Sequence, residues 1–206
     1  HQALTRARFS AGDRAIGKGF EDIRNEVLCL RRELDTLRAE VKAMRKKMSD
    51  AHGTKAGELF DLKHDSGGLV DVEFPTQYLV LGHSHAHPEL TGNLGNIALL
   101  RIAAELDLIP FELAAACADS YRELRRLQHR QRLNDLQSRV PLEEAEAARR
   151  PVIALRRNVF GDEMKGGQAM SEEIELKLAL PRSALGALRR DPLVAAAEKL
   201  GNAVAL

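Results

Sequence analysis

Apolar residues recur along residues 16–48 at steps that alternate between four and three positions. They are Ile16, Phe20, Ile23, Val27, Leu30, Leu34, Leu37, Val41, Met44 and Met48. This spacing keeps the side chains on one stripe of a helix, so we predict a single α-helix over residues 13–48, about 50 Å long at about 1.5 Å per residue. Asp13 is its predicted N-cap, and the helix is expected to end near residues 51–53. Such a stripe can pair two chains, but the apolar faces of the later helices favour packing within this chain.

Helical patterns resume after residue 68 and are separated by prolines. We predict helices over residues 69–81, 93–106, 111–133 and 143–160, and an extended segment over residues 59–62. Pro151 lies inside the last pattern and predicts a break or a kink there. Aromatic residues make up only 4% of the chain, so aliphatic side chains should supply most of the core. The predicted fold is mainly α: a helical bundle with one long N-terminal helix, little sheet and a short C-terminal strand–helix appendage.

The charges of the chain nearly balance, with 31 Lys and Arg against 30 Asp and Glu and a net charge of +1. No global field therefore favours nucleic acid or an acidic membrane as a partner, and no apolar run approaches the ~20 residues of a membrane span. The basic residues beside the long stripe, Arg45 among them, are interpreted as a solvated face. Cys29 and Cys117 are expected to be buried, reduced thiols. No leader follows His1, so we expect a cytoplasmic chain whose start resembles the middle of a longer polypeptide.

Residues 60–74 bring a lysine, two consecutive glycines and two carboxylates close together in the sequence. Paired glycines let a backbone adopt positive φ and approach a ligand, and a helix that starts after them can offer free N–H groups to an anion. Lys63 supplies positive charge, and Asp71 and Glu73 are suited to hold a metal or orient a polar substrate. The pattern indicates a phosphate or nucleotide site. A capped turn before a solvated, acidic helix start explains it equally well.

These residues also carry a family resemblance. The run FDLKHDSGGLVDVEFPTQYLVL, residues 60–81, resembles the K-x-x-x-G-G-hydrophobic-x-[DE]-hydrophobic-E-F-x-x-Q signature of bacterial glutamine synthetase adenylyltransferase (glutamate–ammonia-ligase adenylyltransferase). The opening HQALTRAR resembles the E-H-Q-A-L-x-R-A-R segment upstream of that signature. The similarity covers about residues 1–162 and fits the C-terminal part of the adenylylating half. Pro75 departs from the family pattern and puts the local helix geometry in question.

The resemblance implies a nucleotidyltransferase of nitrogen regulation that uses ATP and Mg²⁺ to transfer AMP to a tyrosine of glutamine synthetase. The full-length family also removes the AMP, and its implied partners are glutamine synthetase and the PII regulatory protein. The metal-binding aspartates of the family lie upstream of E-H-Q-A-L, and this sequence does not contain them. We therefore expect an incomplete catalytic set and an inactive isolated chain. By resemblance, the residues that line the nucleotide site are Arg6, Arg8, Lys63, Gly67, Gly68, Asp71, Glu73 and Gln77. A surface ion pair is the alternative for both arginines.

The end of the chain changes character. Residues 163–170 have the composition of a linker, and Glu173, Glu175 and Lys177 then alternate with apolar residues, which would place them on one face of a strand. This pattern resembles the first strand of the CYTH, or triphosphate tunnel metalloenzyme, family, in which the carboxylates bind metal and the lysine meets the triphosphate. Too few strands follow to build a tunnel. We therefore interpret residues 171–206 as an incomplete CYTH-like segment, joined to residues 1–162 by a fusion or a misplaced stop.

Three functions stay open on the sequence alone. The first is part of an adenylyltransferase. The second is a helical interaction module that binds glutamine synthetase or PII without touching a nucleotide. The third is a triphosphate- or metal-binding CYTH remnant at the C-terminal end.

Overall fold

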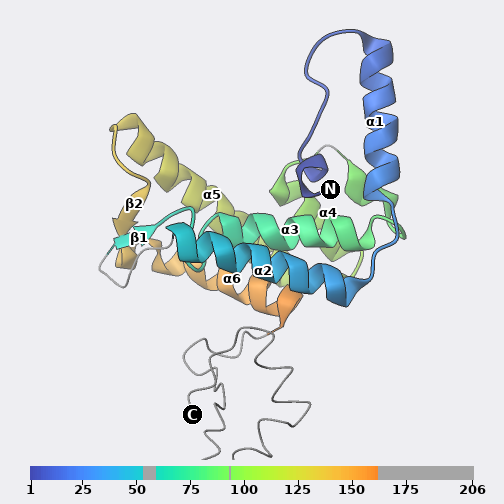
Figure 1. The fold of residues 1–206 in the computed structure, drawn as a ribbon. Helices are drawn as coiled ribbons and strands as arrows, with labels where there is room; N and C mark the ends of the chain where they lie inside the picture. The colour runs from blue at the N-terminus through green and yellow to red at the C-terminus, as the bar shows by residue number, and fades with distance from the viewer. Residues whose placement is uncertain (53–58, 93, 162–206) are drawn as a thin grey trace, which may run out of the picture. The chain divides into compact units, whose positions relative to one another are not determined.

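The computed structural model describes residues 1–52, 59–92 and 94–161 (Figure 1). The helices are η1 (Gln2–Thr5), α1 (Arg14–Leu28), α2 (Leu34–His52), α3 (Val70–His83), η2 (Pro88–Thr91), α4 (Asn96–Glu105), α5 (Phe111–Leu133) and α6 (Leu142–Phe160). Strands β1 (Leu59–Asp61) and β2 (Arg139–Pro141) form one antiparallel pair. The predicted mainly α fold with little sheet is therefore confirmed. The predicted linker, the proposed domain boundary and the segment with Glu173, Glu175 and Lys177 lie outside the described residues.

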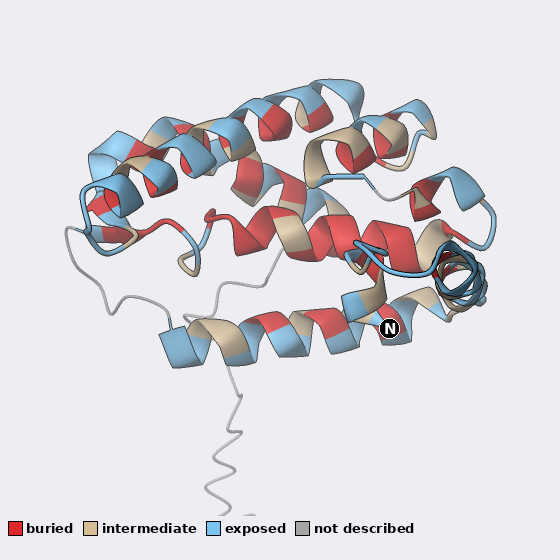
Figure 2. Cartoon of the chain, turned by 90° about the horizontal axis from the view of Figure 1, so that it is seen from above, coloured by how far each residue is buried: buried red, intermediate tan, exposed pale blue. Residues whose placement is uncertain are grey.

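Helix α3 occupies the centre of the bundle. Every residue from position 70 to position 81 is buried except Glu73, and α2, α4, α6, η1 and η2 all contact this helix (Figure 2). A helix that is apolar on all sides needs such an enclosure, because it has no face to offer to water. Pro75 lies beyond its first turn, yet the helix continues through it to His83. The departure at Pro75 thus leaves the helix intact.

The prediction of one helix over residues 13–48 is wrong, because residues 29–33 separate α1 from α2. Arg32 donates hydrogen bonds to the carbonyls that end α1, at 2.7 Å to Val27 O and 3.0 Å to Leu28 O, and it reaches Leu81 O of α3 at 3.0 Å. Burial lowers the pKa of this guanidinium. The next residue, Glu33, accepts from backbone N–H groups in the first turn of α2. These two side chains replace the hydrogen bonds that a continuous helix would make.

The apolar stripe over residues 16–48 is divided between α1 and α2, and only its α2 part contains buried residues. On α2, Leu37 and Val41 are buried, whereas on α1 the side chains of Ile16 and Ile23 are 72% and 63% exposed. Helix α1 projects from the bundle, and its main contacts with other helices are those with η1 and η2 (Figure 1). The predicted N-cap is confirmed, because Asp13 Oδ1 accepts from Ala15 N at 2.6 Å.

The remaining helices agree with the sequence-based expectations to within three residues at each end. Helix α6 continues through Pro151, so the helix is not broken there, and the alternative of a kink stays a prediction. Both cysteines are free, and Cys117 is buried with its Sγ 3.1 Å from Pro151 O. Burial raises the pKa of the Cys117 thiol to about 12. No helix within the described ranges is both long enough and apolar enough to cross a bilayer.

Replacing Arg32 with Met should lower the free energy of unfolding by about 1–2 kcal/mol, because several buried carbonyls lose a charged donor. Urea denaturation of the two proteins measures the difference. The matched control is Arg31→Met, since Arg31 is the exposed neighbour. Equal effects of the two substitutions would show that Arg32 does not fix the junction between α1 and α2.

Candidate functional site

The turn between β1 and α3, residues 62–69, bonds mainly to its own chain. Gly67 N donates to Asp71 Oδ2 over 2.7 Å, and Gly68 N donates to Asp65 O over 2.9 Å. Leu69 N donates to Leu62 O over 2.9 Å, and Val70 N donates to Lys63 O over 3.1 Å. On the other side of the turn, Asp61 Oδ1 accepts from Lys63 N at 2.9 Å and from His64 N at 2.8 Å. The donors at the start of α3 thus already have acceptors. The expectation of free N–H groups for an anion is wrong.

The paired glycines are needed for close approach of the chain to itself. Gly67 has a φ of +88°, and a Cβ added to it would lie 3.1 Å from the Arg149 side chain. A Cβ on Gly68 would lie 2.9 Å from Leu62 O and 3.0 Å from Asp65 O. Any larger residue would push the turn off its own backbone carbonyls.

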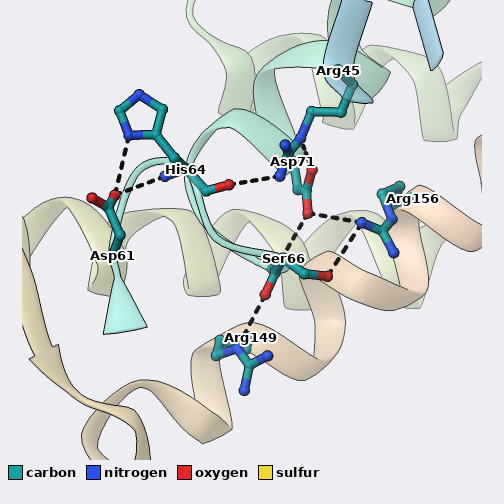
Figure 3. Close-up of polar contacts among 8 residues, drawn as sticks. Arg45, Asp61, His64, Ser66, Asp71, Arg149 and Arg156 are labelled. Carbon is teal, nitrogen blue, oxygen red and sulfur yellow. Dashed lines mark hydrogen bonds and ion pairs between the residues drawn. The ribbon is translucent and has the colours of Figure 1, made fainter. Parts of the chain in front are cut away.

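Asp71 is the centre of this region and is fully buried (Figure 3). Its Oδ1 lies 2.5 Å from Arg45 Nε of α2, and its Oδ2 lies 3.3 Å from Arg156 Nη1 of α6. The same Oδ2 accepts from Gly67 N, and Arg45 Nη2 donates to His64 O at 2.9 Å. One carboxylate therefore joins α2, α3, α6 and the turn through charge-assisted hydrogen bonds.

His64 lies at the edge of the turn. Its Nδ1 is 3.3 Å from Asp61 Oδ1, and its ring centroid is 4.9 Å from that of His52 at the end of α2. Burial lowers the pKa of His64 and outweighs the nearby Asp61 carboxylate, which acts in the opposite direction. His64 is therefore neutral at pH 7, and its contact with Asp61 is a hydrogen bond between a neutral ring and a carboxylate.

Glu73 and Gln77 face the N-terminal segment instead. Arg6 Nη1 lies 3.1 Å from Glu73 Oε2, and Gln2 Nε2 donates to Gln77 Oε1. Asp71 and Glu73 are two positions apart on a helix, so their side chains point to nearly opposite sides. The two sequence segments that carry the family resemblance thus contact each other directly.

Arg24 of α1 holds the same N-terminal segment from the other side. It is 2% exposed and donates from Nε to Leu4 O at 2.8 Å and from Nη1 to Thr91 O at 2.7 Å. Arg24 was not singled out from the sequence, although it lies four residues after Phe20 and four before Leu28 on the same helix face.

Lys63 and Arg8 remain at the surface, where both side chains are exposed. Asp71 faces Arg45 and Arg156, and Glu73 faces Arg6, so Lys63, Asp71 and Glu73 do not share one wall. The period of a helix already separates Asp71 from Glu73 in the sequence. Whether these residues act on a nucleotide stays a prediction.

The cations around Asp71 were not predicted from the sequence. Arg45 was assigned to a solvated face, but it is 6% exposed. A signal for its burial exists, because Leu37, Val41 and Arg45 follow one another at four-residue steps on the buried side of α2. No sequence signal relates Arg156 to Asp71, since 85 positions separate them.

A groove of 590 Å³ lies between η1, α2 and α3. Gln2 and Gln77 contribute to its lining together with Leu37, Val41 and Met44. The groove is thus bordered by signature residues, but Lys63, Asp71 and Glu73 are not among those that line it.

The described residues do not fit a magnesium site. Among them, no group of three or more His, Cys, Asp or Glu side chains is arranged to hold a metal ion. Both oxygens of Asp71 already face guanidinium groups, and Glu73 faces Arg6. Oxygen ligands in this state are not free to coordinate Mg²⁺.

Replacing Asp71 with Asn keeps the shape of the side chain but leaves two largely buried guanidiniums without their shared anion. We expect the free energy of unfolding to fall by about 3–5 kcal/mol. Chemical denaturation measures this loss. Asp35→Asn is the control, because Asp35 is 83% exposed in its pair with Arg38 and its loss should matter little. An Asp71→Asn protein as stable as the original would contradict this account of the site.

Comparisons with known proteins agree with the resemblance. The family model GlnD PII-uridylyltransferase matches residues 35–178. Three relatives are bifunctional glutamine synthetase adenylyltransferase/adenylyl-removing enzymes. The relative from Aromatoleum aromaticum is 71% identical to this chain over 161 residues. The relative from Bordetella bronchiseptica is 53% identical over 163 residues, and the one from Nitrosomonas eutropha is 47% identical over 176 residues. The alignments cover 78–79% of this chain but only 17–19% of the relatives, so the chain spans less than a fifth of their length.

Proposed function

The chain belongs to the GlnD PII-uridylyltransferase family, and we propose that it is a helical part of an enzyme that attaches AMP to glutamine synthetase and removes it. The observation that carries this proposal is the 71% identity over 161 residues to a bifunctional enzyme with both activities in its name. The proposal includes ATP as the AMP donor, a tyrosine of glutamine synthetase as the acceptor, and PII as a regulatory partner.

The contacts between the signature residues support a positioning role for this part. Arg6 meets Glu73, Gln2 meets Gln77, and Asp71 joins the turn to α2 and α6. The signature therefore serves to fix the N-terminal segment and the turn on α3. We assign Gly67, Gly68 and Asp71 to this task, in which they shape the turn instead of touching the nucleotide.

Lys63 is the signature cation that the fold leaves exposed. Its ammonium group makes no ion pair with the residues that the structure describes, whereas Arg6 is engaged by Glu73. An exposed lysine on a rigid turn can meet a phosphate as a point charge. We therefore assign Lys63 the contact with the phosphates of ATP. Because the described residues do not fit Mg²⁺, we assign no step of the transfer to a metal held by them, and we expect this chain alone to be inactive.

A chimera tests the function. The matching segment of the full-length Aromatoleum aromaticum enzyme is replaced by residues 1–161 of this chain, and incorporation of labelled AMP from ATP into glutamine synthetase is measured. We expect the chimera to retain transfer activity within about tenfold of the parent enzyme, a difference of about 1.4 kcal/mol. A folded chimera that transfers no AMP contradicts the proposal.

Within this chimera, Lys63→Met should lower the rate of AMP transfer about tenfold and leave the thermal midpoint unchanged, because the side chain is exposed. Lys47→Met on α2 is the matched control, since it removes another exposed lysine. Equal activity of the Lys63 and Lys47 variants would remove Lys63 from the site. That result would favour the second candidate, a binding module for glutamine synthetase or PII, which the exposed Ile16 and Ile23 on α1 support.

The CYTH-like assignment of Glu173, Glu175 and Lys177 stays a separate proposal. It predicts metal-dependent binding of triphosphate that Glu173→Ala abolishes. Binding that survives this substitution, or that does not need a metal, would reject the assignment.

A further inference from the structure

Two arginines of α6 converge on Ser66, the exposed residue before the paired glycines (Figure 3). Arg149 Nε donates to Ser66 O at 3.1 Å, and Arg156 Nη1 donates to Ser66 Oγ at 3.2 Å. The two arginines are seven positions apart, which is about two helical turns, so they reach the serine from neighbouring levels of the same helix face. Their side chains are 19% and 16% exposed. Ser66 is therefore the point where two partly desolvated cations meet the surface.

The arginines are held in place by the fold. The guanidinium carbon of Arg149 lies 4.9 Å from the centroid of the Phe60 ring. The Arg149 side chain also packs closely on Gly67, because a Cβ added to this glycine would lie 3.1 Å from Arg149 Cβ. Arg156 is fixed by Asp71 Oδ2 at 3.3 Å. A site built from such restrained cations loses little side-chain entropy when an anion binds.

The ion pairs near Ser66 contain more guanidiniums than carboxylates, while Asp65 adds a carboxylate next to Ser66 in the sequence. Arg149 and Arg150 both pair with Glu146, at 2.8 and 3.2 Å, so two guanidiniums share one carboxylate in this part of the described chain. The hydrogen bond from Arg150, and the charges of both arginines, lower the pKa of Glu146 and keep it ionised. Glu146 accepts from Nη1 of Arg149 and Ser66 O accepts from its Nε, so Nη2 is the donor of this guanidinium that remains for a ligand among the contacts of the described residues.

The Ser66 hydroxyl adds a directed donor. Since its oxygen accepts from Arg156, the hydroxyl can rotate its own hydrogen toward a ligand. A hydroxyl and a guanidinium can together donate to several oxygens of a tetrahedral oxyanion, which offers more acceptor oxygens than a carboxylate.

We propose that Ser66 and Arg149, supported by Arg156, form a binding site for the phosphate group of a small molecule on the outer side of the turn. The site uses side chains, because the backbone N–H groups of the turn are already bonded. It deepens the proposed function by adding a phosphate contact to the turn that carries Lys63, and it rests on that function only for the identity of the phosphate compound.

The test is a titration of the full 206-residue chain with inorganic phosphate and with pyrophosphate at constant ionic strength, followed by the amide signals of Gly67 and Gly68 in two-dimensional NMR. We expect saturable shifts with a Kd of about 1 mM. Arg149→Met, which keeps the aliphatic stem on Phe60, should weaken binding at least about tenfold. Acetate at the same concentration should not saturate the site.

Three further variants sharpen the result. Ser66→Asp places a fixed anion beside both arginines and should abolish phosphate binding; since Ser66 is exposed, it carries the test if Arg149→Met does not fold. Glu146→Gln removes the competing carboxylate and should tighten binding a few-fold. Arg126→Gln on α5 removes an exposed, paired arginine elsewhere and should leave binding unchanged.

Two results would overturn the site: an original chain whose glycine signals do not saturate with phosphate, or an Arg126→Gln variant that weakens binding as much as Arg149→Met. The titration uses neither ATP nor glutamine synthetase. Its failure is therefore distinct from a failure of the chimera to transfer AMP.

Discussion

The arrangement of this bundle depends on one buried carboxylate. Asp71 lies at the start of the most enclosed helix and receives Arg45 from α2, Arg156 from α6 and the N–H of Gly67 from the turn. An isolated ion in such a place would be strongly unfavourable, and the desolvation of a paired one offsets much of its attraction. Its effect here is to fix the register of four elements at once. An apolar residue in its place would fill the volume but would leave two guanidiniums without their shared anion and the Gly67 N–H without an acceptor.

This interaction changes the meaning of the signature. The sequence alone indicates a phosphate site here, because lysine, paired glycines and carboxylates are each common at such sites. In the structure most of them are used by the fold: the glycines allow contact with Leu62 O and the Arg149 side chain, Asp71 joins the helices, and Glu73 anchors Arg6. The residues of a functional signature can therefore be required for the structure of a rigid turn as much as for the chemistry beside it.

The sequence predicts the helices well where a single stripe or an apolar run decides the structure. Helix α5 was predicted with its observed bounds, and α3, α4 and α6 nearly so. The junction at residues 29–33 was missed because the apolar spacing continues across it, while the groups that end α1 and start α2 are the side chains of Arg32 and Glu33. Part of the support for that break, Leu81 O, lies 49 positions away. Long-range partners of this kind, like Arg156 for Asp71, leave no trace in local periodicity.

The exchange rate of a single amide hydrogen tests this account most directly. The exchange of the Gly67 amide hydrogen for deuterium is measured, because Gly67 N lies 2.7 Å from Oδ2 of Asp71, whose side chain is fully buried. The account predicts protection comparable to that of amides in the middle of α3, with release only on global unfolding. Exchange at the rate of an exposed loop amide would show that the helix start is open and Asp71 unbound, and would contradict it.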